Sequence, residues 1–224
     1  MSSATTIEAP RSSRKGLTAD VKRIITLVAV VVVLIAMFLS TKIVPKGTTV
    51  GQGPAAFSAA AYGAKQFPIQ QSFIAAHAVD AVTLGAAVKK NHTAAAQKYG
   101  VPVNGGASVE VPVKFTGVVG KVPAAGYTSV KVRGLQSGQL VNVQLGPAIN
   151  GTDLRDATGK AQLGQFENQI QFQDAASAIN TELKKVLTKA GAPNLTGKTV
   201  TVTGVFSLVN PKVWNVTPSN LVVQ

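Results

Sequence analysis

The sequence predicts an α+β protein with three parts: an amino-terminal transmembrane helix, an alanine-rich helical region, and an OB-like five-stranded β-barrel with a helix between strands 3 and 4. Three observations support this prediction. Residues 24–41 form an apolar run without charge, and residues 55–100 space their apolar side chains as helices do. Beyond residue 107 the pattern changes to the period of two that is typical of strands.

The apolar run is long enough to serve as a membrane anchor. A helix over residues 24–41 rises about 1.5 Å per residue and covers roughly 27 Å of a hydrocarbon core about 30 Å thick. Lys42 can snorkel at the far end, so we expect contact with the lipid bilayer from Ile24 to Val44. Five basic residues precede the run, against two acidic ones. This bias predicts a cytoplasmic basic tail over residues 1–23 and a single-pass protein of the cell membrane with its carboxy-terminal domain outside.

A cleaved signal peptide is the alternative for the same run. Its apolar region is usually about 7 to 15 residues long and ends in small residues. Here Phe38 and Leu39 stand near the boundary, which favours an uncleaved signal anchor, although the segment GPAAFSAAA (53–61) just downstream leaves cleavage open.

Composition limits the partners of the exported part. The chain has no cysteine, so the fold depends on its core without disulfides. The net charge is +13, but the basic residues are scattered singly along the chain, and we therefore expect no nucleic-acid partner. Attraction to anionic headgroups or cell-surface polymers is the milder inference.

Residues 45–54 are a Gly-rich linker with too little apolar content to fold, and residues 55–100 form the helical region. We expect two or three helices there, the second starting at Pro68, because proline suits the first helical position. Apolar and small residues from Ile74 to Val88 are spaced to line one helical face.

Residues 101–224 carry the predicted barrel. Alternating residues from Val109 to Phe115 indicate the first strand, in which Pro112 should face an unpaired edge or a bulge. The other strand segments are TSVKVRG (128–134), LVNVQLG (140–146), KTVTVTGVFSLV (198–209) and SNLVVQ (219–224).

One apolar stripe between these segments predicts a helix from about Asp174 to Lys189. Three strands, a helix and two strands is the order of an OB-fold, and glycines inside the strands, such as Gly204, suit the bends of a barrel. An open sheet packed on the helices is the alternative.

The connection between the third strand and this helix holds the predicted ligand-binding residues. Asp153, Arg155 and Asp156 lie between glycines in LGPAINGTDLRDATG (145–159). Arg155 is interpreted in two ways. Its planar guanidinium either donates hydrogen bonds to a ligand carboxylate, phosphate or sugar hydroxyls, or pairs with an aspartate and so fastens the loop onto the barrel. Asn168 extends either network. A general acid/base pair of the two aspartates is a further alternative.

Trp214 is the only tryptophan and the remaining candidate ligand-binding residue. One interpretation places it in the core, plugging the barrel. In the other, its face stacks on a sugar ring.

Several segments together resemble one bacterial family. They are KIVP after the apolar run, VQLGPAINGTDLRDATG, FENQIQFQDAASAIN, and the ending LTGKTVTVTGVFSL with VTPSNLVV. The chain is similar there to the predicted periplasmic lipoproteins of unknown function (domain of unknown function 2291). The resemblance implies a location outside the cytoplasm, and a link to sugar uptake, because genes of this family often lie beside those of ATP-binding-cassette (ABC) sugar transporters.

The chain departs from this family at one position. Members carry a cysteine before K-I-V-P whose thiol takes a lipid, whereas this chain has Thr41 there. A hydroxyl does not replace the thiolate nucleophile, so we expect no lipidation and an apolar helix that stays as the anchor.

No catalytic residue, cofactor or metal is predicted. TGKT at 196–199 lacks the spacing of a phosphate-binding loop and precedes a strand, and His77 and His92 have no cysteine to join them as ligands. We expect a non-enzymatic accessory or ligand-binding protein whose partner is an ABC sugar transporter or its substrate. An envelope scaffold that binds another protein through the helical region is the alternative, and a hydrolase using Asp153 and Asp156 is the third.

Overall fold

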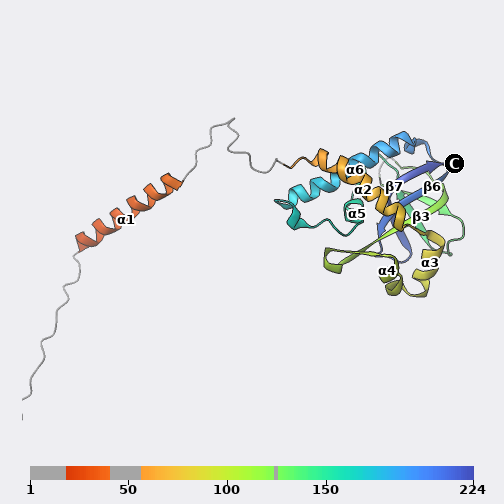
Figure 1. Ribbon diagram of the computed structural model, residues 1–224, viewed down its shortest axis with the longest axis horizontal. Helices are drawn as coiled ribbons and strands as arrows, with labels where there is room; N and C mark the ends of the chain where they lie inside the picture. The colour runs from red at the N-terminus through yellow and green to blue at the C-terminus, as the bar shows by residue number, and fades with distance from the viewer. Residues whose placement is uncertain (1–18, 41–56, 124–125) are drawn as a thin grey trace, which may run out of the picture. The chain divides into compact units, whose positions relative to one another are not determined.

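The computed structural model describes residues 19–40, 57–123 and 126–224, and Figure 1 shows its elements. The chain divides into two compact units, residues 1–55 and 56–224. The helical region and the barrel belong to the same unit. Most of the predicted basic tail, the linker 45–54 and the end of the predicted anchor, residues 41–44, lie outside the described residues.

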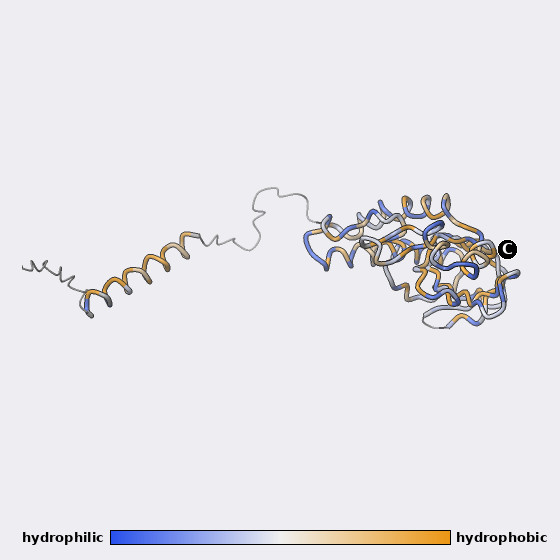
Figure 2. Tube along the Cα trace, turned by 90° about the horizontal axis from the view of Figure 1, so that it is seen from below, coloured by the Kyte–Doolittle hydropathy of each residue, from blue (hydrophilic) through white to orange (hydrophobic). Residues whose placement is uncertain are grey.

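Helix α1 (Ala19–Ser40) is the described element of the first unit. It begins before the predicted start at Ile24, and Asp20 in its first turn suits the positive end of the helix dipole. Figure 2 shows apolar residues along most of its length, and their side chains are exposed, Phe38 at 74% and Leu39 at 78%. Among the described residues, no helix was found with the length and apolar run that crossing a membrane requires.

Five strands close into a barrel. In spatial order they are β3 (Ser108–Val119), β4 (Tyr127–Val132), β5 (Leu140–Gln144), β7 (Val213–Val223) and β6 (Thr199–Ser207). β6 pairs back onto β3, and β5 with β7 is the one parallel pair of the ring. Along the chain, helix α6 (Gln169–Lys189) lies between β5 and β6, the third and fourth barrel strands in sequence order. The predicted OB-like barrel is therefore confirmed, and the open-sheet alternative is wrong.

Two short strands outside the ring pair with β3. β2 (Val101–Val103) pairs antiparallel with it as far as Glu110, and β1 (Val79–Asp80) pairs parallel with it from Val113. Pro112 lies in the gap between these two pairings. β3 thus pairs with four strands: β1, β2, β4 and β6.

A bulge bends the ring at Gly204. The register of β6 against β7 shifts between Thr203 and Gly204, as the glycine pattern predicted. A Cβ on Gly204 would lie 2.6 Å from the carbonyl oxygen of Thr217, so the close approach of the two strands requires glycine.

Three helices precede the barrel: α2 (Ala59–His77), α3 (Ala81–Lys90) and α4 (His92–Tyr99). The prediction that a helix starts at Pro68 is wrong, because α2 begins after its N-cap Ser58 and continues through the proline. The buried face that includes Phe67 and Ile74 supplies the packing that offsets the hydrogen bond lost at Pro68.

The helical face predicted from Ile74 to Val88 is interrupted at residues 78–80. There the chain forms β1, and the Asp80 side chain caps α3 by accepting hydrogen bonds from the backbone of Val82 and Thr83. α6 also starts earlier than about Asp174, because the Asn168 side chain caps it by accepting from the backbone of Gln171.

α2 and α6 lie side by side over the barrel, as Figure 1 shows. Gly63 makes this contact possible, since a Cβ there would lie 2.6 Å from the backbone of Ala178. The core continues into the barrel, where Phe206 and Trp214 stack with ring centroids 5.0 Å apart.

Candidate functional site

Arg155 and Asp156 form a buried ion pair in α5 (Asp153–Asp156), a single turn after the third barrel strand. Arg155 Nε and Nη2 donate to the two carboxylate oxygens of Asp156 at 2.8 and 2.9 Å. Nη1 donates to the backbone oxygen of Phe172 at 2.9 Å, and the guanidinium lies 3.5 Å from the centroid of the Phe172 ring. The guanidinium is thus engaged on three nitrogens and on its face.

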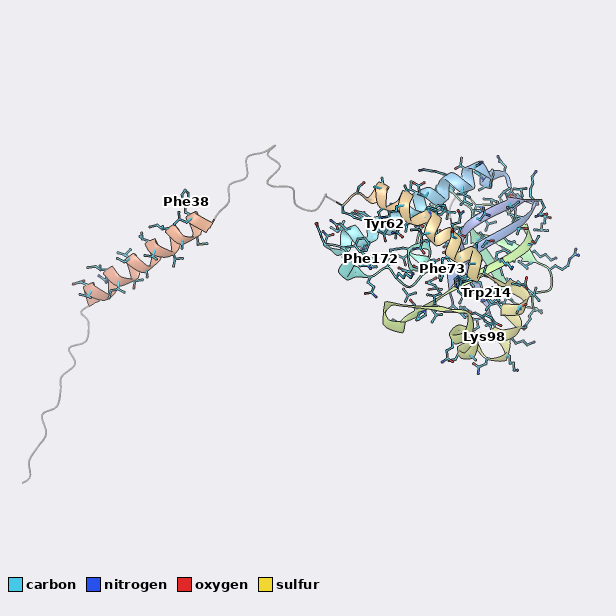
Figure 3. All side chains as sticks on the ribbon, in the orientation of Figure 1. Phe38, Tyr62, Phe73, Lys98, Phe172 and Trp214 are labelled. Carbon is cyan, nitrogen blue, oxygen red and sulfur yellow. The ribbon has the colours of Figure 1, made fainter. Side chains whose placement is uncertain are left out.

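The surroundings of this pair are aromatic. Tyr62, Phe166 and Phe172 follow one another with ring centroids 5.5 and 5.2 Å apart, and Figure 3 shows Tyr62 and Phe172 at the same end of the helix pair. Arg155 is 4% exposed and Asp156 is 3% exposed. This placement corresponds to the alternative in which Arg155 fastens the loop, here onto the start of α6.

Asp153 enters a second polar network on the outer surface of the barrel. Thr217 donates its hydroxyl to Asp153 at 2.7 Å, and Gln144 donates to the Thr217 hydroxyl at 2.9 Å. The Gln144 amide also donates to the Tyr127 hydroxyl, 3.2 Å away, and exchanges hydrogen bonds with the backbone of Asn150. The network therefore links α5 to the strands β4, β5 and β7.

Glu110 is a buried carboxyl group that the sequence pattern did not single out. It is 3% exposed, accepts a 2.6 Å hydrogen bond from Ser207, and has no partner at Oε2. The pKa of Glu110 is raised from 4.5 to about 8, chiefly by burial and also by the nearby Asp153 charge, while the Ser207 hydrogen bond opposes both. A signal was present on the same outer face, where the apolar Val205 pairs with Pro112 on one side and Thr217 on the other. An apolar side chain on the outer face indicates that other elements cover it.

Asp153 is a second carboxyl group with a raised pKa. Burial also raises the pKa of Asp153, the hydrogen bond from Thr217 lowers it, and Asp156 raises it. Glu110, Asp153 and Asp156 are absent from the lining of five surface cavities in the described part of this unit.

The other two predicted site residues lie elsewhere in the fold. Asn168 caps α6, so its side-chain oxygen is occupied. Trp214, labelled in Figure 3, is fully buried and stacked on Phe206, and its indole N–H has no partner. The structure thus brings Asp153, Arg155 and Asp156 into one turn but leaves Trp214 out of their hydrogen bonds.

The cavity with the most distinctive lining lies where the α3–α4 junction meets two barrel loops. It measures about 610 Å³, and we call it the lysine cavity. Its walls are Gly85, Val88, Lys89, Lys90, Asn91 and His92 from the helices, Gln136–Gln139 from the β4–β5 loop, and Pro211 and Lys212 from the β6–β7 loop.

Side-chain amides hold these walls together. Gln136 donates to the backbone oxygen of Gly85 at 3.0 Å, and Gln139 donates to that of Pro211 at 3.2 Å. Behind Gly85 lies Trp214, whose ring would be 3.8 Å from a Cβ placed on the glycine. The sequence pattern did not reveal this cavity, because its lining comes from three segments that only the fold brings together.

No metal centre emerges from the described residues, in which no three His, Cys, Asp or Glu side chains are grouped to hold an ion. His77 stacks on Phe73 with ring centroids 4.0 Å apart, and its Nδ1 lies 2.8 Å from the backbone oxygen of the same residue. His92 lies instead in the wall of the lysine cavity.

Comparisons with known proteins agree with this architecture. The family model described as predicted periplasmic lipoprotein (DUF2291) matches residues 30–222. The chain is also similar to the crystal structure of an OB-fold protein from Thermotoga maritima, with a TM-score of 0.61, 21% identity, and coverage of 75% of this chain and 99% of that one. At this identity the likeness shows the fold alone. No curated protein matches the chain.

Proposed function

This chain belongs to the family of predicted periplasmic lipoproteins of unknown function, and on that premise we propose that it acts outside the cytoplasm as a binding protein for a small polar solute. The lysine cavity is the site of this proposal. We propose that the role is accessory and non-catalytic, since Asp153 and Asp156 are already engaged with Thr217 and Arg155.

The lysine cavity is the observation that carries the proposal. Its volume of about 610 Å³ falls within the range of roughly 300 to 1,000 Å³ that small-molecule sites occupy. One of its walls, at Pro211 and Lys212, is the loop between the fourth and fifth barrel strands. In OB-folds this loop helps to bind oligosaccharides and oligonucleotides.

A link to sugar uptake is the finer part of the proposal. Its support is the resemblance to a family whose genes often lie beside those of ABC sugar transporters. In this role the protein presents a solute to such a transporter, or regulates it, from the outer side of the membrane.

Thermal-shift measurements on the full chain in detergent test the binding role. A solute that binds only the folded state raises the melting temperature, by an amount that grows with its concentration relative to Kd. We expect a sugar or sugar derivative to raise it, and the rise to be lost in Ser137→Trp, which places a bulky side chain in the cavity lining at an exposed loop position. A panel of sugars and sugar derivatives that leaves the melting temperature unchanged contradicts the proposal.

A scaffold role is the second candidate, favoured by apolar side chains that the paired helices expose. Ile69 on α2 is 50% exposed and Ile170 on α6 is 70% exposed. Pull-down from detergent-solubilised membranes, with Ile170→Ser as the matched variant, distinguishes this role, since only a protein contact depends on that side chain.

Attachment through α1 is the remaining part of the proposal. The helix exposes apolar side chains from Ile24 to Leu39, and basic residues precede it. Helices that are apolar all round belong in a core or a bilayer, and the predicted anchor 24–44 extends past the described end of α1 at Ser40. We therefore propose that residues 24–44 together anchor a single-pass protein with its amino terminus in the cytoplasm. Protease added to intact spheroplasts should digest the barrel unit, and full protection of that unit contradicts the topology.

A further inference from the structure

We propose that the lysine cavity selects solutes that carry an anionic group, a phosphate or a carboxylate. This inference rests on the proposed binding function and specifies its ligand class. The shared chemistry is an oxyanion that accepts hydrogen bonds from ammonium and N–H donors.

The charge of the lining is of one sign. Lys89, Lys90 and Lys212 stand at the cavity, and none of the residues that line it is an aspartate or a glutamate. Of the cations in the described part of the chain, Arg155 and Lys185 each lie next to a carboxylate, whereas no ion pair is found for these three lysines. Three unpaired ammonium groups at one cavity create a local positive potential that attracts anions.

The fold does not require this concentration of charge. Lys89 and Lys90 end α3, where basic side chains interact favourably with the helix dipole. Lys212 comes from the β6–β7 loop, more than a hundred residues along the chain, and no helix end accounts for its position. Its presence in the same cavity lining as the two helical lysines is the feature that a binding site explains.

Uncharged donors complete the site. Asn91 caps α4 by accepting from the backbone of Ala94, but the N–H groups of the first turn of a helix have no partner within it. His92 opens that turn and lines the cavity, and its Nε2 is buried without a hydrogen-bond partner.

The protein contains its own reporter of occupancy. Trp214 is the only tryptophan, and its ring lies behind Gly85 in the cavity wall. Binding in the cavity should therefore change the intrinsic fluorescence of the full chain, and titration of this signal gives Kd.

The experiment compares four probes on the full chain in neutral-lipid nanodiscs. They are a hexose, the same hexose as its 6-phosphate, inorganic phosphate, and glycerol 3-phosphate, which represents the head of an anionic glycerolipid. We expect the hexose phosphate to bind at least tenfold more tightly than the hexose. If glycerol 3-phosphate binds most tightly instead, the anion site stands and its source is a lipid head.

Lysine variants locate the binding. Lys212→Gln and Lys89→Gln should each weaken the preferred anion about tenfold, and Lys212→Glu should weaken it further. Lys131→Gln makes the same charge change on the exposed side of β4 and should leave Kd unchanged. Melting temperatures of the variants identify any that fail to fold, and the remaining variants then decide the outcome.

Two results overturn the inference in different ways. Equal affinity for the hexose and its phosphate removes the anion preference and leaves the proposed binding function in place. Absence of any signal or melting shift with all four probes overturns both.

Discussion

Ser207 donates a hydrogen bond of 2.6 Å to Glu110 across the β3–β6 ladder, on the outer face of the barrel. That face is not open to water here, because Glu110 is only 3% exposed. The hydrogen bond favours the ionised carboxylate, but burial outweighs it and raises the pKa of Glu110 to about 8. A carboxylic acid that keeps its proton near neutrality therefore lies within the fold.

The stability of the protein should fall as the pH rises from about 5 to about 8. The folded state holds a proton on Glu110 in this window, whereas the unfolded chain releases it near its ordinary pKa of 4.5. Stability changes by up to about 1.4 kcal/mol per pH unit for one such proton, and the raised pKa of Asp153 acts in the same direction. Urea unfolding at several pH values measures the slope. In Glu110→Gln the slope should be much smaller, and a flat curve for the unmodified chain contradicts the prediction.

Loss of the Arg155–Asp156 pair should strongly destabilise the protein. Arg155→Met leaves the Asp156 carboxylate buried without its partner, at a cost of roughly 3 to 5 kcal/mol in the free energy of unfolding. Lys185→Met, which breaks the exposed pair with Glu182, should cost less than about 1 kcal/mol. Urea unfolding compares the two variants, and similar losses would show that Arg155 does not fasten the loop.

A methyl group at Gly63 should separate α2 from α6. The added Cβ would lie 2.6 Å from the backbone of Ala178, and backbone cannot move aside as a side chain can. We expect Gly63→Ala to cost roughly 1 to 3 kcal/mol. Gly164→Ala is the matched control, because a Cβ there meets no atom within 4 Å. Thermal unfolding measures both, and equal melting temperatures contradict the close contact.

The protein should not be acylated in cells, although it belongs to a family of predicted lipoproteins. Thr41 stands where the resemblance implies the modified cysteine, and the chain contains no cysteine at all. Growth with a radioactive fatty acid should leave the protein unlabelled. Thr41→Cys should restore the label in a host that processes lipoproteins, and a labelled band from the unmodified chain is the contrary result.

The strands could be predicted because each barrel strand has one face in the core. Val111, Val113 and Phe115 alternate with less apolar neighbours, and the alternation alone identifies β3. The order of three strands, a helix and two strands then limits the topology to few choices. A helix start was wrongly predicted at Pro68, because proline favours the first helical position. The packing of α2 on α6 overrides this local preference, and α2 continues through the proline.

The candidate sites were harder to predict, because their contacts come from segments that are distant in the sequence. Glu110 has the spacing of an exposed residue, and its burial depends on chain segments that are remote in sequence and cover the outer face. A pair of Arg155 with an aspartate was one of two alternatives, and only the fold shows that Asp156 is the partner and that the pair is buried. The lysine cavity has no motif, since His92 and Lys212 meet only after the barrel closes.

The closure of β6 onto β3 also limits the order in which the molecule can be made. Glu110 and Ser207 are 97 positions apart, and β7 lies between β5 and β6, so the ring remains open until the fifth barrel strand has been synthesised. Pairings between distant segments form slowly, and unpaired strands attract other chains in the meantime. The nascent protein should therefore need a holding chaperone for most of its synthesis, and a truncation that ends before Thr199 should aggregate where the full chain does not.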